Sequence, residues 1–223
     1  MNQDVKRKPM AIGTKEIDSQ NDAAVPATGK VRVIACGMIA REILAINDQL
    51  GRDHIDLKCL PADFHHHPEK IAPAMDIAIR EAKAEGFTEI FAGYADCGTG
   101  GALDKVCKKH GVERIAGPHC FSFYIGNDAF AGEDHMTTFF ITDFLARHFE
   151  TFMVKPLGLD RHPQLRDIYF ANYRKALYLA QTDDPELSAR AGEAARFLGL
   201  EYERRYTGYG NLVPALADLK TPA

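Results

Sequence analysis

Residues 89–104 have the sequence EIFAGYADCGTGGALD, and this stretch decides the fold class. The apolar run predicts a buried strand over Glu89–Tyr94, and the residues after the glycines predict a helix that extends to about His110. A glycine-rich turn between a strand and a helix lets backbone N–H groups approach a ligand at the positive end of the helix. Cys97 lies in this turn, where we expect a thiolate to be favoured.

The chain repeats this order of strand and helix on both sides of the glycine-rich turn. Strands that alternate with helices form parallel sheets, because each helix returns the chain to the same edge. The sequence therefore predicts the α/β class, with a doubly wound, mostly parallel sheet of four to five strands and a helical C-terminal extension. The strands are expected at Val31–Cys36, Ile55–Leu60, Glu89–Tyr94 and Val112–Ala116, with helices at Ile39–Leu50 and Glu69–Gly86.

The C-terminal extension is predicted from Pro163 onward. Apolar residues recur there at helical spacing from Leu165 to Ala180, which indicates a helix. Two segments are candidate strands: the first is expected to be a strand or an extended segment, and the second an edge strand. These segments are Thr137–Thr142 and Glu201–Tyr206, and further helices are expected at Asp143–Phe149 and Glu186–Leu198.

Length and composition indicate one domain. The 223 residues are 46% hydrophobic, which is sufficient for a substantial core. We expect a single α/β domain over residues 31–213, a disordered polar tail at residues 1–30 and a flexible tail at residues 214–223. The net charge is −4 with acidic and basic residues mixed, so no nucleic-acid partner is expected.

The sequence also indicates the compartment. No apolar run approaches the roughly 20 residues that span a membrane, so no membrane partner is expected. The basic residues Lys6, Arg7 and Lys8 are not followed by an apolar segment, so we expect no signal peptide and a cytoplasmic location. The chain has five cysteines, and an odd number in a cytoplasmic chain favours free thiols or metal ligands over disulfides.

A parallel sheet would bring four candidate ligands to one edge. Cys36 ends the first predicted strand, Cys97 and Cys120 follow the third and fourth, and His65 lies in the loop after the second. Ligands bind beyond the carboxyl ends of the strands in such sheets. Three thiols and an imidazole suit zinc, or a metal such as iron, and zinc with three protein ligands keeps one position for substrate.

Two other interpretations remain open for the same residues. Cys97 is also a candidate nucleophile with His65 or His119 as its catalytic base. A buried cysteine that only packs in the core is the third possibility, and it is the one we favour for Cys59 and Cys107. His119 is expected to point away from its neighbour Cys120.

The glycine-rich turn is a candidate cofactor-binding loop. Its residues Gly98, Thr99, Gly100 and Gly101 have neither the lysine of a Walker motif nor the G-x-G-x-x-G spacing, so nucleotide binding is disfavoured. The alternative role for Thr99 is that of a helix N-cap.

Several motifs together resemble a known family. They are Ala35-Cys36-Gly37, Leu60-Pro61-Ala62 with His65 and Pro68, Tyr94-Ala95-Asp96-Cys97-Gly98-Thr99-Gly100, Gly117-Pro118-His119-Cys120, Leu157–Pro163, Tyr169–Arg174 and Thr207–Gly210. Over about residues 31–213 the chain resembles the family catalogued as domain of unknown function 1638. The family pattern has His-Asn where this chain has His65-His66.

The resemblance implies a metabolic role. Members of this family tend to be encoded beside corrinoid-dependent methyltransferases, so it implies one-carbon, methylamine or betaine metabolism. We expect a metal-thiolate protein, with zinc or iron on Cys36, Cys97, Cys120 and His65, that binds a small molecule and acts with a corrinoid protein. The alternative is a non-catalytic accessory module that binds a corrinoid methyltransferase or delivers metal or cofactor to it, so that corrinoid is reached only through this partner.

The first testable prediction concerns the N-terminal tail. Deleting residues 1–28 should leave the melting temperature unchanged, because this segment has too few apolar residues to offset the entropy of ordering. Thermal denaturation of the truncated and full-length chains measures this. A decrease of several degrees would contradict the prediction.

Overall fold

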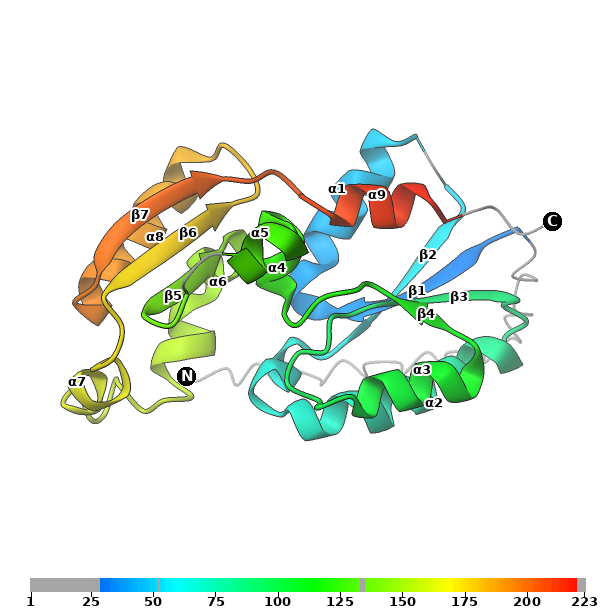
Figure 1. The fold of residues 1–223 in the computed structure, drawn as a ribbon, viewed down its shortest axis with the longest axis horizontal. Helices are drawn as coiled ribbons and strands as arrows, with labels where there is room; N and C mark the ends of the chain where they lie inside the picture. Colours follow the sequence, from blue (N-terminus) through cyan, green and yellow to red (C-terminus); the bar gives the residue numbers. More distant parts are fainter. Residues whose placement is uncertain (1–28, 52, 133–134, 220–223) are drawn as a thin grey trace, which may run out of the picture.

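The computed structural model describes residues 29–219 except residues 52, 133 and 134. Most of the tail expected at residues 1–30, and the last four residues of the chain, therefore lie outside the described residues. The described part has the α/β architecture that the sequence predicts, and it contains two parallel sheets side by side (Figure 1).

The first sheet has four parallel strands in the order β2-β1-β3-β4. β1 is buried on both faces, as its apolar sequence requires in a sheet covered by helices on both sides. β3 lies close against it, since a Cβ on Gly93 would come within 2.9 Å of the Ala35 Cβ. The strands are β1 (Val31–Cys36), β2 (Ile55–Leu60), β3 (Glu89–Gly93) and β4 (Glu113–Arg114).

Helices cover both faces of this sheet (Figure 1). Ile34 faces the apolar sides of α2 and α3 in one core cluster. Val33 and Ala35 point to the opposite face, where they share a core with α1. These helices are α1 (Ala40–Gln49), α2 (Ile71–Ala84) and α3 (Ala102–His110), with short turns η1 (Gly37–Ile39), η2 (Ala62–His66) and η3 (Pro68–Lys70) between the elements.

The second sheet has three parallel strands in the order β5-β6-β7. One face packs on α6 and α8 through a core cluster that includes Tyr178 and Ala191. The elements of this part are α4 (Cys120–Ile125), α5 (Asn127–Gly132), β5 (Thr138–Thr142), α6 (Asp143–Phe149), the π-helical turn η4 (Glu150–Val154), α7 (Leu165–Tyr169), β6 (Lys175–Ala180), α8 (Pro185–Leu198) and β7 (Glu201–Tyr206).

The prediction of a helix up to Ala180 is wrong for its last part. Residues Lys175–Ala180 form β6, the central strand of the second sheet. Its sequence KALYLA is buried on both faces, and a short apolar run of this kind cannot be assigned to strand or helix from periodicity alone. The two extended segments are strands β5 and β7, as predicted, and they pair with β6 rather than with the first sheet.

The C-terminal helix α9 (Leu212–Ala217) returns from the second sheet to the first and lies beside α1 (Figure 1). Its Leu212 and Leu216 are fully buried. They belong to one apolar core that includes Val33 of β1 and Leu177 of β6. We expected the domain to end at residue 213 and a flexible tail to follow. Instead, α9 continues through this position to Ala217.

Gly210 makes this return possible, and it provides the second prediction. It has φ +50°, and a Cβ there would lie 2.3 Å from the Phe123 carbonyl oxygen and 2.7 Å from the Tyr124 Cα. Backbone atoms of α4 cannot move aside as a flexible side chain can. Gly210→Ala should therefore lower the free energy of unfolding by about 2 kcal/mol or more.

Gly192 provides the matched control. It lies inside α8, and a Cβ there would meet only Tyr202 ring atoms at 3.9 Å and beyond. Gly192→Ala should be neutral or should stabilise by about 0.5–1 kcal/mol, because alanine is the better helix former. Urea denaturation measures both variants, and equal effects of the two substitutions would contradict the argument.

Candidate functional site

The four predicted ligands lie together at the carboxyl edge of the first sheet. Cys36 is the last residue of β1, His65 lies in η2 after β2, Cys97 follows β3, and Cys120 is the first residue of α4. All four line one small cavity of about 20 Å³, which we call the thiol cavity. The prediction of a shared edge is confirmed, since β1, β3 and β4 are neighbours in the sheet.

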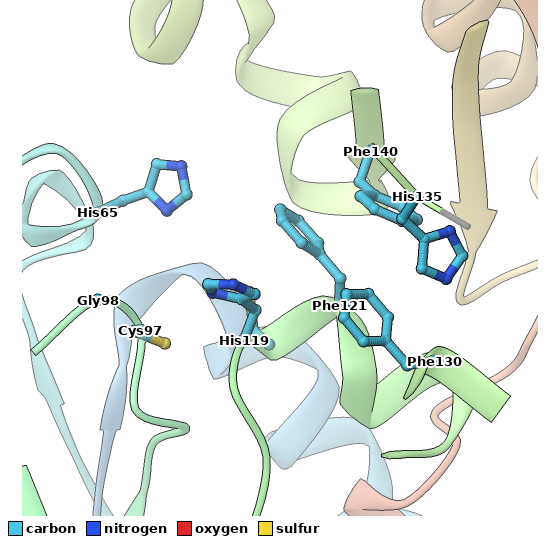
Figure 2. Close-up of a pocket in the computed structure, with 9 residues that line it drawn as sticks. His65, Cys97, Gly98, His119, Phe121, Phe130, His135 and Phe140 are labelled. Carbon is cyan, nitrogen blue, oxygen red and sulfur yellow. The ribbon is translucent and has the colours of Figure 1, made fainter. Parts of the chain in front are cut away.

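A larger cavity of about 420 Å³ opens beside the thiol cavity, and we call it the aromatic cavity. Figure 2 shows Cys97 and His65 on one side of it, a group of aromatic rings on the other side, and His119 between them. The two cavities share His65, Cys97 and Cys120. The aromatic side is formed by Phe121, Phe130, His135 and Phe140.

The sequence did not predict the aromatic side. Phe140 comes from β5 of the second sheet, and it stacks on Phe121 of α4 with ring centroids 5.1 Å apart. His135 lies 4.7 Å from the Phe130 ring and 5.1 Å from the Phe140 ring. This group depends on how the second sheet packs against α4 and α5, and no spacing in the sequence indicates that contact.

His119 was expected to point away from Cys120, but both residues line the aromatic cavity. His119 is the N-cap of α4 with extended backbone angles, φ −145° and ψ 160°, and Cys120 begins the helix. The change from extended to helical backbone between them lets the two side chains face the same space.

The backbone at Cys97 adopts a conformation that is uncommon for any residue except glycine, with φ +48°. It is fixed by hydrogen bonds from Asp96 N–H to the Gly117 carbonyl, 3.0 Å, and from Cys97 N–H to the Pro118 carbonyl, 2.9 Å. The loops after β3 and β4 are therefore tied together at the cavity. Non-glycine residues in such strained conformations cluster at functional sites.

The glycine-rich turn is organised by Asp96. Its carboxylate accepts hydrogen bonds from Thr99 Oγ1 at 2.7 Å, from Gly101 N–H at 2.9 Å and from Gly100 N–H at 3.2 Å. These backbone groups, which we expected to face a cofactor, thus have a partner within the chain. Gly98 lines the aromatic cavity.

The pKa values of the three thiols are raised, whereas the position of Cys97 in the turn was expected to favour its thiolate. Burial and the neighbouring Cys36 raise the pKa of Cys97 to about 12. Burial, followed by Cys97 and Cys36, raises the pKa of Cys120 well above its usual value, and burial raises that of Cys36. The Asp96 carboxylate accepts the N–H groups of the turn, and its negative charge also raises the pKa of the nearby Cys97.

Tyr94 is a further residue of the site that sequence reasoning missed. It lines the thiol cavity, and its buried hydroxyl has no partner in hydrogen-bond geometry among the described residues. The hydroxyl lies near the Cys36 thiol, and this contact acts to lower the pKa of Cys36 against the larger effect of burial. A buried polar group without a partner costs free energy, so a ligand or a charged sulfur beside it would be stabilised.

Only His65 of the three consecutive histidines reaches the cavities. His66 hydrogen-bonds to the Phe152 carbonyl at 2.8 Å, which ties η2 to η4, and His67 pairs with Glu69 at 3.4 Å. Partial burial, and after it His66 and His119, lower the pKa of His65. Its imidazole is therefore neutral near pH 7, the form that binds a metal or accepts a proton.

The remaining cysteines lie elsewhere. Cys59 is exposed on β2 and Cys107 is buried in α3, and neither lines the thiol or aromatic cavity. Within the described ranges, no three Cys, His, Asp or Glu side chains are arranged to hold a metal ion as they stand. Helices in the same part of the chain are all too short or too polar to cross a membrane.

The third prediction tests the state of the thiols in metal-free protein. At pH 8, iodoacetamide should modify Cys59 at least about tenfold faster than Cys97 or Cys120, because only the thiolate reacts. Modification of Cys97 should accelerate about tenfold per pH unit up to its pKa, since each unit raises the thiolate fraction tenfold. Peptide mass spectrometry measures the rates. Fast labelling of Cys97 at pH 8 would show that its pKa is not raised.

The chain matches the model of a known protein family. The model of a family described as a protein of unknown function (DUF1638) matches residues 59–216. The matched range includes His65, Cys97 and Cys120 but begins after β1 and Cys36. No curated protein and no solved structure matches the chain. Because the family model covers more than half of the sequence, including most of the candidate site, the chain belongs to the DUF1638 family.

Proposed function

We propose that the protein is a metal-thiolate protein that binds zinc through Cys36, Cys97 and Cys120. His65 is either the fourth ligand or leaves that position open toward the aromatic cavity. The observation that carries this proposal is that all four residues line one small cavity although they come from four separate segments of the chain. The donor set fits zinc, which binds thiolates and imidazole in tetrahedral sites.

The electrostatics of the thiols support the metal over a lone nucleophile. Three neighbouring thiols in a partly buried site resist ionisation, and the pKa of Cys97 is near 12. A cysteine nucleophile paired with His65 would require the opposite shift. A divalent cation removes the repulsion between the thiolates and deprotonates its sulfur ligands, which makes the same cluster of residues favourable.

The surroundings of the site supply the groups that such a centre needs. The Tyr94 hydroxyl, which has no partner in hydrogen-bond geometry among the described residues, is a candidate donor to the Cys36 sulfur once that sulfur is charged. His65 is neutral and lies at the junction of the two cavities. The bound metal would activate the thiol of a substrate, and His119, or His65 where it is not a ligand, would accept the proton of that thiol.

The biological role that we propose is corrinoid-linked methyl transfer in one-carbon, methylamine or betaine metabolism. It is based on the family resemblance and is compatible with the chemistry of the aromatic cavity, whose rings favour small apolar or methylated groups. The small-molecule substrate would occupy this cavity, next to Cys97.

A non-catalytic accessory role is the second candidate. It is favoured by three exposed apolar side chains within six residues of the chain, Ile168, Tyr169 and Tyr173, which are 67%, 46% and 36% exposed. Apolar side chains exposed at neighbouring positions of the sequence are candidates for a protein-binding surface. Methyl transfer assayed with the purified chain, a methyl-corrinoid protein and a thiol distinguishes the two. Turnover supports the enzyme, whereas binding without turnover supports the accessory module.

The fourth prediction is the metal site itself. Chain purified without an affinity tag and treated with a chelator should bind one zinc ion, and its affinity should rise with pH because each thiol must lose a proton. Cys97→Ser and Cys120→Ser should each weaken zinc binding by at least about 100-fold, with non-additive effects in the double variant because all ligands act on one ion. Titration against a competing chelator measures these affinities.

Cys59→Ser is the matched control, since Cys59 is exposed on the neighbouring strand and outside both cavities. It should bind zinc as tightly as the parent chain. Tyr94→Phe removes only the hydroxyl and should weaken binding by about tenfold, as is usual for groups that hydrogen-bond to a metal ligand. The proposal fails if Cys97→Ser and Cys120→Ser retain the affinity of the parent chain.

A further inference from the structure

A third cavity lies at the carboxyl edge of the second sheet. Its volume is about 330 Å³, and we call it the Glu42 cavity. Residues that follow β5, β6 and β7 form one wall, and one side of α1 from Arg41 to Asp48 forms the other. This is the position where open parallel sheets bind ligands. The lining includes Arg41, Glu42, Asp143, Arg147, Thr182 and Tyr209, and it shares no residue with the thiol or aromatic cavity.

Asp143 is fully buried, and each oxygen of its carboxylate already accepts two hydrogen bonds. Oδ1 accepts hydrogen bonds from the Tyr178 hydroxyl at 2.7 Å and from Gln181 N–H at 3.0 Å. Oδ2 accepts from Thr182 N–H at 3.1 Å and from Thr182 Oγ1 at 2.5 Å. A carboxylate has about four acceptor positions, so Asp143 fixes the ends of β5 and β6 and has little capacity left for a ligand.

Glu42, unlike Asp143, has a carboxylate oxygen that accepts no hydrogen bond from the described residues. It is only 4% exposed, yet its Oε2 has no hydrogen-bond partner among the described residues. Burial, and after it Asp143, raise the pKa of Glu42 to about 6, while Arg147 and Arg41 act in the other direction. The group is therefore mostly charged at pH 7. A buried carboxylate with an unused acceptor is costly unless a donor reaches it.

Two arginines line the same cavity. Arg147 Nη2 lies 3.8 Å from Asp143 Oδ2, which is an ion-pair distance but too long for a hydrogen bond. Arg41 is exposed and belongs to the same turn of α1 as Glu42. A guanidinium presents planar N–H donors that match a carboxylate.

The charges of this lining exclude simple ions as the best ligand. A metal cation would be repelled by the positive charges of Arg41 and Arg147. A simple anion would be repelled by the acidic residues of the lining, which are Glu42, Asp48 and Asp143. A molecule that carries both charges satisfies both groups. We propose that the Glu42 cavity binds a small zwitterionic amino acid, with its ammonium group on the Glu42 carboxylate and its carboxylate on Arg147 and Arg41. This site is independent of the proposed metal site.

The fifth prediction tests this site by calorimetry on the full-length chain at pH 7.5. The probes are glycine, L-alanine and β-alanine, with acetate and methylamine as ligands that carry one charge each. At least one amino acid should bind, and acetate and methylamine should each bind at least about tenfold more weakly than that amino acid, since each loses one of two charged contacts. Equal binding of acetate would indicate an anion site, and equal binding of methylamine a cation site. Either result would overturn the proposal, as would failure of all three amino acids to bind.

Substitutions of Glu42 and Arg147 test whether these residues bind the amino acid. Glu42→Gln keeps the shape of the side chain and should weaken amino-acid binding at least about tenfold, and Arg147→Gln should do the same. Glu193→Gln is the control, because Glu193 is exposed on α8 and does not line the Glu42 cavity. Glu42→Gln should not lower the melting temperature, since it removes a buried charge whose Oε2 lacks a partner. Unchanged binding in a folded Glu42→Gln variant would overturn the assignment.

Discussion

The packing of α4 between the two sheets is the contact on which the rest of the structure depends. Phe123 is fully buried in a core that includes Val33 of β1 and Leu177 of β6. The carbonyl of the same residue accepts a hydrogen bond from Asn211 N–H at 2.7 Å, which fixes the start of α9. Since Cys120 is the first residue of α4, this apolar contact also determines where the third thiol lies.

Much of the first sheet could be predicted from sequence, because each of its strands is bounded by clear turns. Chain order and the rule for parallel connections were then sufficient to bring Cys36, His65, Cys97 and Cys120 to one edge. The second sheet was less predictable. KALYLA has no alternation to distinguish a strand from a buried helix, and only its neighbours β5 and β7 make it a strand.

The site residues that the sequence missed have a common physical reason. Tyr94 and Glu42 matter because a polar atom of each is buried without a partner, and burial of a single atom follows from tertiary packing alone. The raised pKa of Cys97 has the same origin, since the local position at a turn favours a thiolate while desolvation and nearby thiols oppose it. Sequence motifs identify the reactive residue types, whereas packing sets their charge.

The return of α9 has a consequence for how the chain folds during synthesis. Leu212 and Leu216 complete the same core as Val31 and Val33, although most of the sequence separates them. β1 and α1 leave the ribosome early, but the core that they share with α9 is complete only after Leu216 has emerged. Contacts of such high sequence separation slow folding and prolong the exposure of apolar surface during synthesis.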